Sequence, residues 1–155
     1  MKSKVLNYQT KISRPLPEVF DFFSKAENLN RLTPESIHFK ILTPLPILMK
    51  VGQRIDYRIK LFGIPFLWQT EICEWQPNVK FADKQLSGPY VEWHHQHIFE
   101  EENGQTLMTD IITYKSKGWI LAPFLHWFFV DRNVKEIFAH RETKLNEIFP
   151  TTKFN

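Results

Sequence analysis

The pattern of apolar and polar positions separates a long C-terminal helix from a preceding series of strands. In the segment 123–149, apolar residues recur at the 3.6-residue spacing of an amphipathic helix. Pro123 suits the first turn of this helix, and Pro150 suits its end. The apolar stripe consists of Trp127, Val130, Val134, Ile137, Phe138, Leu145, Ile148 and Phe149. We expect the stripe, including Val134, Phe138, Leu145 and Phe149, to be buried against a curved sheet.

The N-terminal part of the chain predicts one strand and two short helices. Lys4–Ile12 alternates loosely between apolar and polar residues, which is typical of a strand. In Arg14–Phe23, two prolines precede an apolar cluster, which predicts a short helix. Asn28–Thr33 predicts a second short helix that Pro34 ends. Ile37–Leu42 is a candidate for a short strand.

From Gly52 onward the apolar period changes to two, which predicts a series of half-buried strands. Asn103-Gly104 is the strongest hairpin signal in the chain, because both residues tolerate the positive φ of a tight turn. Short connections between successive strands predict an antiparallel meander. The predicted strands are 54–61, 66–76, 80–86, 90–102 and 105–115.

This order predicts an α+β fold in which a curved antiparallel sheet of about seven strands surrounds the long C-terminal helix. Two short helices follow the first strand. The length of 155 residues fits one domain spanning residues 1–155. Aromatic residues make up 15% of the chain, more than a compact core of this size needs, which favours a ligand cavity between sheet and helix.

Composition and charge exclude several classes of function. The net charge is +3, but acidic and basic residues are mixed along the chain, so we predict no nucleic-acid binding. Cys73 is the only cysteine and the N-terminal segment contains no apolar signal, so we expect a cytoplasmic protein. The apolar segment Trp119–Phe129 suits either a lip that touches membranes or a wall of the cavity entrance, and we favour the wall. We predict no obligate protein partner.

Seven stretches of the sequence, taken with the order of elements, resemble a known superfamily. They are Pro17–Phe23, Asn28–Pro34, Arg54–Arg58, Phe81–Asp83, Gly88–Phe99, Thr106–Asp110 and Ile137–Arg141. Together they resemble the helix-grip fold of the START-like and birch-pollen-allergen-like superfamily (SRPBCC), closest to bacterial ligand-binding members labelled polyketide cyclase-like or cell division inhibitor. The resemblance implies a curved sheet that grips the C-terminal helix, with a cavity for a small, largely apolar, lipid- or polyketide-like ligand.

A histidine-rich strand carries the candidate chemistry. If Asn103-Gly104 forms a two-residue turn, Glu102 pairs with Gln105 and the register of the hairpin follows. The register then pairs Phe99 with Met108, His97 with Asp110, His95 with Ile112 and Trp93 with Tyr114. These residues share one strand face, which is the better candidate for the interior because it is rich in aromatic residues.

Three interpretations are open for the polar patch that consists of His95, His97 and Asp110. His95, His97 and Asp110 suit a metal ion held by two imidazoles and a carboxylate. His97 and Asp110 suit a general acid–base couple in a cyclase- or hydratase-like enzyme, which is our alternative to ligand binding. Hydrogen bonding within the patch explains the trio without either, and we favour this interpretation. We therefore expect no metal and, since no phosphate loop is present, no cofactor.

Two further charged residues are expected near the patch. Asp83 shares a strand face with Phe81 and either joins the patch or is solvated on an edge strand. Arg141 interrupts the apolar stripe of the helix, and its permanent charge requires a partner, for which Asp110 or Asp83 is favoured over a substrate. The expected cavity residues are Tyr57, Trp68, Asp83, Trp93, His95, His97, Phe99, Met108, Asp110, Ile112, Tyr114, Phe138 and Arg141.

Overall fold

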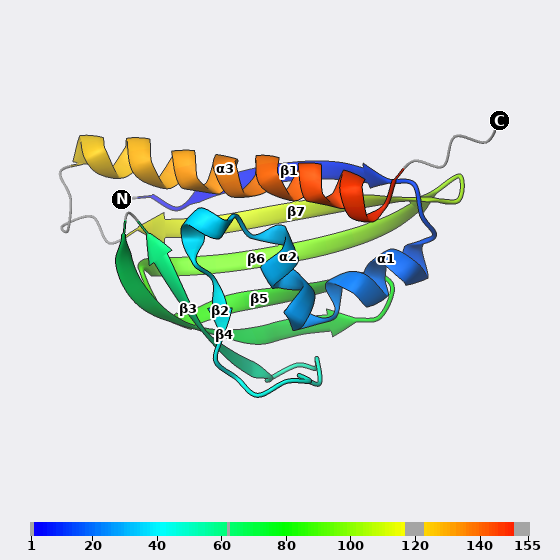
Figure 1. Cartoon of the computed structure of the whole chain (residues 1–155), viewed down its shortest axis with the longest axis horizontal. Helices are drawn as coiled ribbons and strands as arrows, with labels where there is room; N and C mark the ends of the chain where they lie inside the picture. Colours follow the sequence, from blue (N-terminus) through cyan, green and yellow to red (C-terminus); the bar gives the residue numbers. More distant parts are fainter. Residues whose placement is uncertain (1, 62, 117–122, 151–155) are drawn as a thin grey trace.

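A computed structural model describes residues 2–61, 63–116 and 123–150, with the backbone alone described for residues 61, 116 and 123–133. Figure 1 shows a curved sheet with the long helix lying along one side of it. Among the described residues the sheet has seven strands in the order β1-β7-β6-β5-β4-β3-β2, and every neighbouring pair is antiparallel. The predicted α+β helix-grip architecture is confirmed.

The elements follow the predicted order closely. The strands are β1 (Lys4–Ile12), β2 (Lys40–Ile41), β3 (Arg54–Leu61), β4 (Ile64–Gln76), β5 (Lys80–Ser87), β6 (Tyr90–Glu102) and β7 (Gln105–Ser116). The helices are α1 (Leu16–Phe23), α2 (Leu29–Leu32) and α3 (Pro123–Ile148), with short 3-10 turns η1 (Ala26–Asn28) and η2 (Glu35–Ile37).

The predicted strand Ile37–Leu42 is mostly wrong. Only Lys40 and Ile41 pair with β3, because Ile37 ends the turn η2 and His38 adopts a left-handed conformation with φ of 46°. A left-handed residue cannot continue an extended strand. The edge-strand alternative for Asp83 is also wrong, since β5 is the fourth of the seven strands.

The hairpin of β6 and β7 has the predicted register. Asn103 and Gly104 both have positive φ, 52° and 76°, as a tight two-residue turn of this hand requires. Glu102 pairs with Gln105, and all four predicted pairs farther along the strands are present. A local turn signal therefore placed His95 and His97 on the inner face of the sheet.

The strands are not regularly paired throughout. The register shifts between Gln69 and Thr70 and between Ile72 and Glu74 of β4, and again between Tyr90 and Glu92 of β6. Extra residues of this kind bend a strand and increase its twist. The bends give the sheet a concave inner face, which the figure shows facing the helices (Figure 1).

Three clusters of buried side chains cover this inner face. One joins α1 to the end of α3, and includes Phe20, Phe99 and Leu145. A second surrounds Tyr57 on β3, and a third surrounds Tyr114 on β7. The contacts of α1 with β6 and β7, and of α2 with α3, close the face around the space between these clusters.

The inner face of α3 is buried for most of its described length. Val134, Leu145 and Phe149 are buried as predicted, and so is Arg141. Phe138 is only half-buried, contrary to the prediction, because it borders a cavity; its ring stacks on Tyr8 with centroids 4.1 Å apart. The side chains of Trp127 and Val130, and the proposed cavity wall Trp119–Phe129, lie outside what the structure describes. None of the described helices is long and apolar enough to cross a membrane.

The contact between α3 and the sheet can be tested at Leu145, which is 2% exposed. Leu145→Ala removes a fully buried side chain and is expected to lower the free energy of unfolding by about 2–5 kcal/mol. Urea denaturation measures the change. The exposed neighbour Glu142 provides the control, since Glu142→Ala should change it by less than about 0.5 kcal/mol. Equal effects at the two positions would contradict the packing described here.

Candidate functional site: a cavity between sheet and helix

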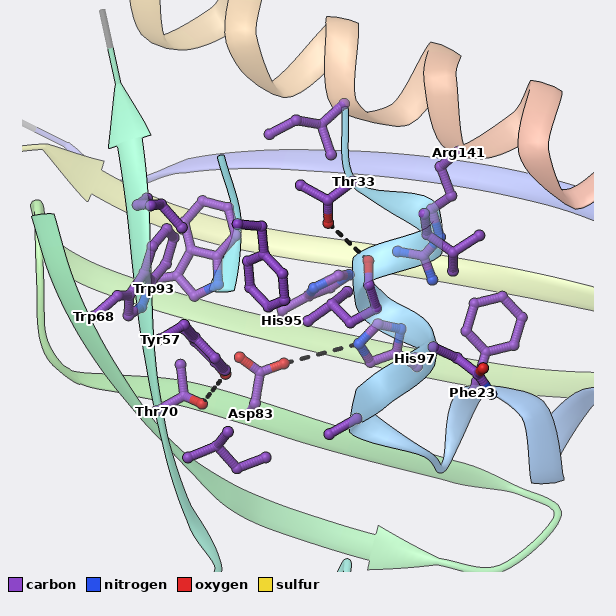
Figure 2. Close-up of a pocket in the computed structure, with 18 of the residues that line it drawn as sticks. Phe23, Thr33, Tyr57, Trp68, Thr70, Asp83, Trp93, His95, His97 and Arg141 are labelled. Atoms are coloured by element: carbon purple, nitrogen blue, oxygen red, sulfur yellow. Dashed lines mark hydrogen bonds and ion pairs between the residues drawn. The ribbon is translucent and has the colours of Figure 1, made fainter. Parts of the chain in front are cut away.

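A cavity of about 200 Å³ lies between the inner face of the sheet, the helices α1–α3 and the segment that joins α2 to β3. Figure 2 shows its wall, with β3–β6 on one side and α3 above. A cavity of about 150 Å³ holds benzene in an apolar protein interior. The cavity is therefore large enough for a molecule of one or two rings or a short chain.

Eight of the expected cavity residues line this space. They are Tyr57, Trp68, Asp83, Trp93, His95, His97, Phe138 and Arg141. They come from four different strands and from α3, so the curved sheet and the helix together form the site. In Figure 2, Trp68 and Trp93 lie side by side at one end of the pocket, and Asp83 is directed at His97.

Five of the expected residues do not line the cavity, namely Phe99, Met108, Asp110, Ile112 and Tyr114. Each is at most 3% exposed. Four of them lie on β7, which runs beside α3 (Figure 1), so helix packing covers their side chains. Phe99 is covered by α1, where it contacts the ring of Phe20 at 5.2 Å between centroids.

Sequence reasoning missed the remaining lining residues. They are Phe22, Phe23, Lys25, Ala26, Asn28, Leu29, Leu32, Thr33, Ile37, Phe39, Met49, Ile55, Ile59, Thr70, Ile72, Phe81, Tyr90, Val134 and Ile137. The strand alternation could have identified some of them, since Ile55 and Ile59 share a face with Tyr57 and Thr70 shares one with Trp68. The wall formed by α1 and α2 carries no such signal, because it depends on how these helices pack.

Most of the cavity wall is aromatic or aliphatic. The rings of Trp68 and Trp93 meet edge to face at 5.1 Å between centroids, and Tyr90 packs beside Trp93 at 4.9 Å. Tyr57 hydrogen-bonds Thr70 through their hydroxyl groups, and burial raises the pKa of Tyr57 well above its usual value, so the phenol stays neutral. Trp68 Nε1 is buried without a hydrogen-bond partner among the described residues, which leaves one donor available to a ligand.

The polar groups of the wall are organised around one carboxylate oxygen. Asp110 Oδ1 lies 3.0 Å from His95 Nε2, 2.8 Å from His97 Nδ1 and 3.4 Å from Arg141 Nη2. The contact with His97 is short, but its direction does not suit a hydrogen bond. Asp110 is 1% exposed, and a carboxylate buried this deeply requires such partners. Of the two expected partners of Arg141, the ion-pair partner is thus Asp110.

Arg141 also contacts two aromatic rings. Its guanidinium carbon lies 4.9 Å from the ring centroid of Phe23 and 5.4 Å from that of Phe138. Both distances are within the range of cation–π attraction. Arg141 therefore connects α3 to β7 through Asp110 and to α1 through Phe23.

The surroundings of the two histidines shift their pKa values in opposite directions. Burial, together with the nearby charge of His97, lowers the pKa of His95 to about 4, so this imidazole is neutral at neutral pH. Burial also acts to lower the pKa of His97, but the carboxylates of Asp110 and Asp83 outweigh it and the pKa is raised. Burial acts to raise the pKa of Asp110, yet Arg141 and the two imidazoles lower it far below its usual value.

This arrangement supplies a proton donor and acceptor at the cavity wall. His97 lines the cavity, and its Nε2 lies 3.8 Å from Asp83 Oδ2. Asp110 lies behind the imidazoles and does not reach the cavity, so it acts by orienting them and by balancing charge. The chemistry available to a bound molecule is thus hydrogen bonding, charge neutralisation or proton transfer at His97.

The ion pair of Asp110 and Arg141 can be tested with a double-mutant cycle. Asp110→Ala and Arg141→Ala should each cost about 3–5 kcal/mol of stability, because each leaves a buried charge without its partner. The double variant should cost much less than the sum of the two. Chemical denaturation of the four proteins gives the coupling energy.

The exposed pair of Lys25 and Asp21, 2.7 Å apart, is the control for this cycle. Its coupling should not exceed about 1 kcal/mol, since water and side-chain entropy offset most of the attraction. If the effects of Asp110→Ala and Arg141→Ala are small and additive, the two residues do not stabilise the fold as a pair.

Comparisons with known proteins address the fold. No protein-family model matches the sequence, and no curated protein sequence matches it. Solved structures do. The Zhui aromatase/cyclase from a Streptomyces species has a TM-score of 0.77 at 10% identity, with 99% of this chain and 100% of that chain covered. A START superfamily protein from Mycobacterium smegmatis has a TM-score of 0.67 at 10% identity, covering 93% of this chain and 98% of that one.

A plant protein extends the comparison. A major latex-like protein from Panax ginseng has a TM-score of 0.58 at 17% identity, covering 90% of this chain and 97% of its own. These three proteins carry different names, but each superimposes on most of this chain with a TM-score above 0.5, so they share its fold. The chain therefore has the same helix-grip fold as the aromatase/cyclase, the START superfamily protein and the major latex-like protein.

Proposed function

We propose that this protein binds a small, largely apolar ligand, lipid- or polyketide-like, in the cavity between sheet and helix. The observation that carries the proposal is the cavity of about 200 Å³, whose wall is mainly aromatic and aliphatic. Its few polar groups are gathered on one side, at Asp83, His95, His97 and Arg141. Small-molecule sites in proteins typically combine an apolar lining with a few convergent polar groups.

The arrangement of the wall favours a ligand with an apolar body and one polar end. Trp68, Trp93 and Phe138 would contact the body, whereas His97 and Arg141 would face a hydroxyl, carbonyl or carboxylate group. Such a group would accept hydrogen bonds from these buried side chains, whose donors are otherwise not all paired. The solved structures support the proposal through their fold, since one is named an aromatase/cyclase and another a START superfamily protein.

The proposal predicts that 2-naphthol, a two-ring molecule with one hydroxyl group, binds at one site per chain. Calorimetry gives the stoichiometry, and the fluorescence of Trp68 and Trp93 should change because both indoles line the cavity. Ile137→Trp should reduce affinity at least about tenfold by filling space in the cavity.

The matched control is Ile148→Trp on the same helix. Ile148 is also half-buried, but it packs against the cluster near α1 and does not line the cavity. This variant should retain wild-type affinity if it remains folded, which circular dichroism establishes. Failure of 2-naphthol and of other small apolar molecules to bind the wild-type protein would exclude the carrier function.

A cyclase- or hydratase-like activity is a second candidate, which the position of His97 favours. Its imidazole lines the cavity and lies between two carboxylates, Asp83 and Asp110, as a general acid or base would require. Asp110 would position this group and would not contact the substrate.

This candidate predicts turnover of a short linear polyketone. The absorbance of the aromatic product measures the reaction. His97→Gln should abolish the reaction while 2-naphthol still binds, which separates loss of chemistry from loss of the cavity. If no reaction is detectable with wild-type protein and His97→Gln changes only the affinity for 2-naphthol, the enzymatic candidate fails and ligand binding alone remains.

A further inference from the structure

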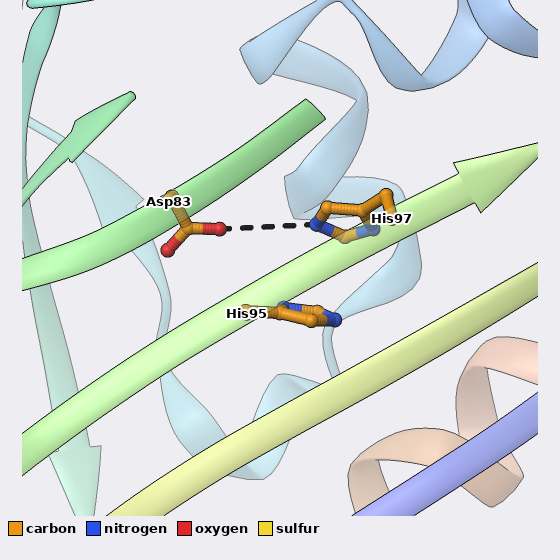
Figure 3. Close-up of side chains that lie close together, drawn as sticks. All are labelled: Asp83, His95 and His97. Carbon is orange, nitrogen blue, oxygen red and sulfur yellow. Dashed lines mark ion pairs between the residues drawn. The ribbon is translucent and has the colours of Figure 1, made fainter. Parts of the chain in front are cut away.

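Asp83, His95 and His97 form a second arrangement of polar groups within the same wall. Asp83 on β5 lies directly opposite His95 on β6, and His97 is the next residue along on the same face. Figure 3 shows the carboxylate of Asp83 directed at the imidazole of His97, with the His95 ring beside them over β6. Each residue offers one ligand atom, and these atoms lie within 4.8 Å of one another.

Asp110 occupies the other side of both imidazoles. Its Oδ1 contacts His95 at Nε2 and His97 at Nδ1. The His95 contact is a hydrogen bond that fixes this ring and leaves the lone pair of Nδ1 facing away from Asp110, as in metal-binding histidines, whereas His97 Nδ1 is held close to the carboxylate without a hydrogen bond in a suitable direction. His95 Nδ1 and His97 Nε2 are therefore the nitrogens that face away from Asp110, and His97 Nε2 faces Asp83.

The distance between His97 and Asp83 is compatible with a shared ion. His97 Nε2 and Asp83 Oδ2 are 3.8 Å apart, which is too long for a hydrogen bond. Two ligands on one tetrahedral zinc ion lie about 3.4 Å apart, given metal–ligand distances near 2.1 Å. A shift of a few tenths of an ångström in the two side chains would bring them to that separation.

The charge of the cluster also favours a cation. With both imidazoles neutral, the carboxylates of Asp83 and Asp110 outnumber the guanidinium of Arg141 by one negative charge. These groups are mostly removed from water, since His97 is 7% and Asp110 1% exposed. A net negative charge in such surroundings is stabilised by a bound cation or by a proton on His97.

We propose, in place of the metal-free patch expected from the sequence, that Asp83, His95 and His97 bind a first-row divalent transition-metal ion, with Asp110 behind the two imidazoles and hydrogen-bonded to His95. Two histidines and one carboxylate are a ligand set that suits zinc and ferrous ions. All three residues line the cavity, so the remaining coordination positions would face it. An oxygen of a bound ligand or a water molecule would occupy those positions.

Zn²⁺ alone serves as the probe for this site. The full-length protein is dialysed against a chelator and titrated with Zn²⁺ by calorimetry, and Co²⁺ is added separately to record the visible absorption of a low-coordinate site. We expect one ion per chain. Asp83→Asn should weaken binding at least about tenfold and remove the Co²⁺ bands, while the pair of Asp110 and Arg141 remains to support the fold.

Two matched variants test whether binding occurs elsewhere. His94→Gln changes the neighbouring histidine on the outer face of β6, and His140→Gln changes one on α3; neither lines the cavity, and both should keep wild-type affinity. His97→Gln tests the site independently, because His97 lies on β6 whereas Asp83 lies on β5. This variant should weaken Zn²⁺ binding as Asp83→Asn does.

The proposal is overturned if wild-type protein binds no Zn²⁺ up to about 1 mM. It is equally overturned if Asp83→Asn and His97→Gln bind as wild type does, since the ion would then occupy a surface site. These titrations contain no apolar ligand, and 2-naphthol binding can be measured with chelator present. Metal binding and apolar-ligand binding can therefore fail independently.

Discussion

The burial of one carboxylate, Asp110, is the constraint on which the rest of the structure depends. A charge that is 1% exposed must be compensated, and three side chains from two other elements meet it. His95 and His97 come from the neighbouring strand β6, whereas Arg141 comes from α3. A single oxygen of Asp110 therefore links the pairing of the strands to the packing of the helix.

Apolar contacts supply most of the attraction between α3 and the sheet, but they are not directional. The ion pair adds the direction that sets where along β7 the helix lies.

The cavity follows from where the helix lies and from how the sheet bends. Because α3 covers β7, the buried residues Met108, Ile112 and Tyr114 are used for packing and are unavailable to a ligand. The irregular pairing of β4 and β6 bends the sheet away from the helix. The interior between the resulting clusters is not filled by side chains. This arrangement explains why a chain rich in aromatic residues does not form one continuous core.

The same polar cluster stabilises the fold and forms part of the cavity wall. Its inner layer, Asp110 with Arg141, is covered and supports the helix. Its outer layer, His95, His97 and Asp83, reaches the cavity and is available to a ligand, a proton or a metal ion. The inner layer restrains the rotamers of the outer one, as groups behind a binding site commonly do. Variation of Asp83 is therefore a milder perturbation than variation of Asp110, although both carry the same charge.

The sequence by itself determined the strands, the long helix and the register of the β6–β7 hairpin. Strand and helix periods are local, and the Asn103-Gly104 turn determines which residues of two adjacent strands are paired. For this reason the residue pattern alone places His97 opposite Asp110, and Arg141 on the inner side of α3.

Only the tertiary structure decided which inner residues line the cavity and which are covered. It placed Asp83 at the cavity wall and Asp110 behind it, left Phe138 half-buried, and formed one wall from α1 and α2. These outcomes depend on contacts between segments distant in the chain, and neither period nor turn chemistry carries that information.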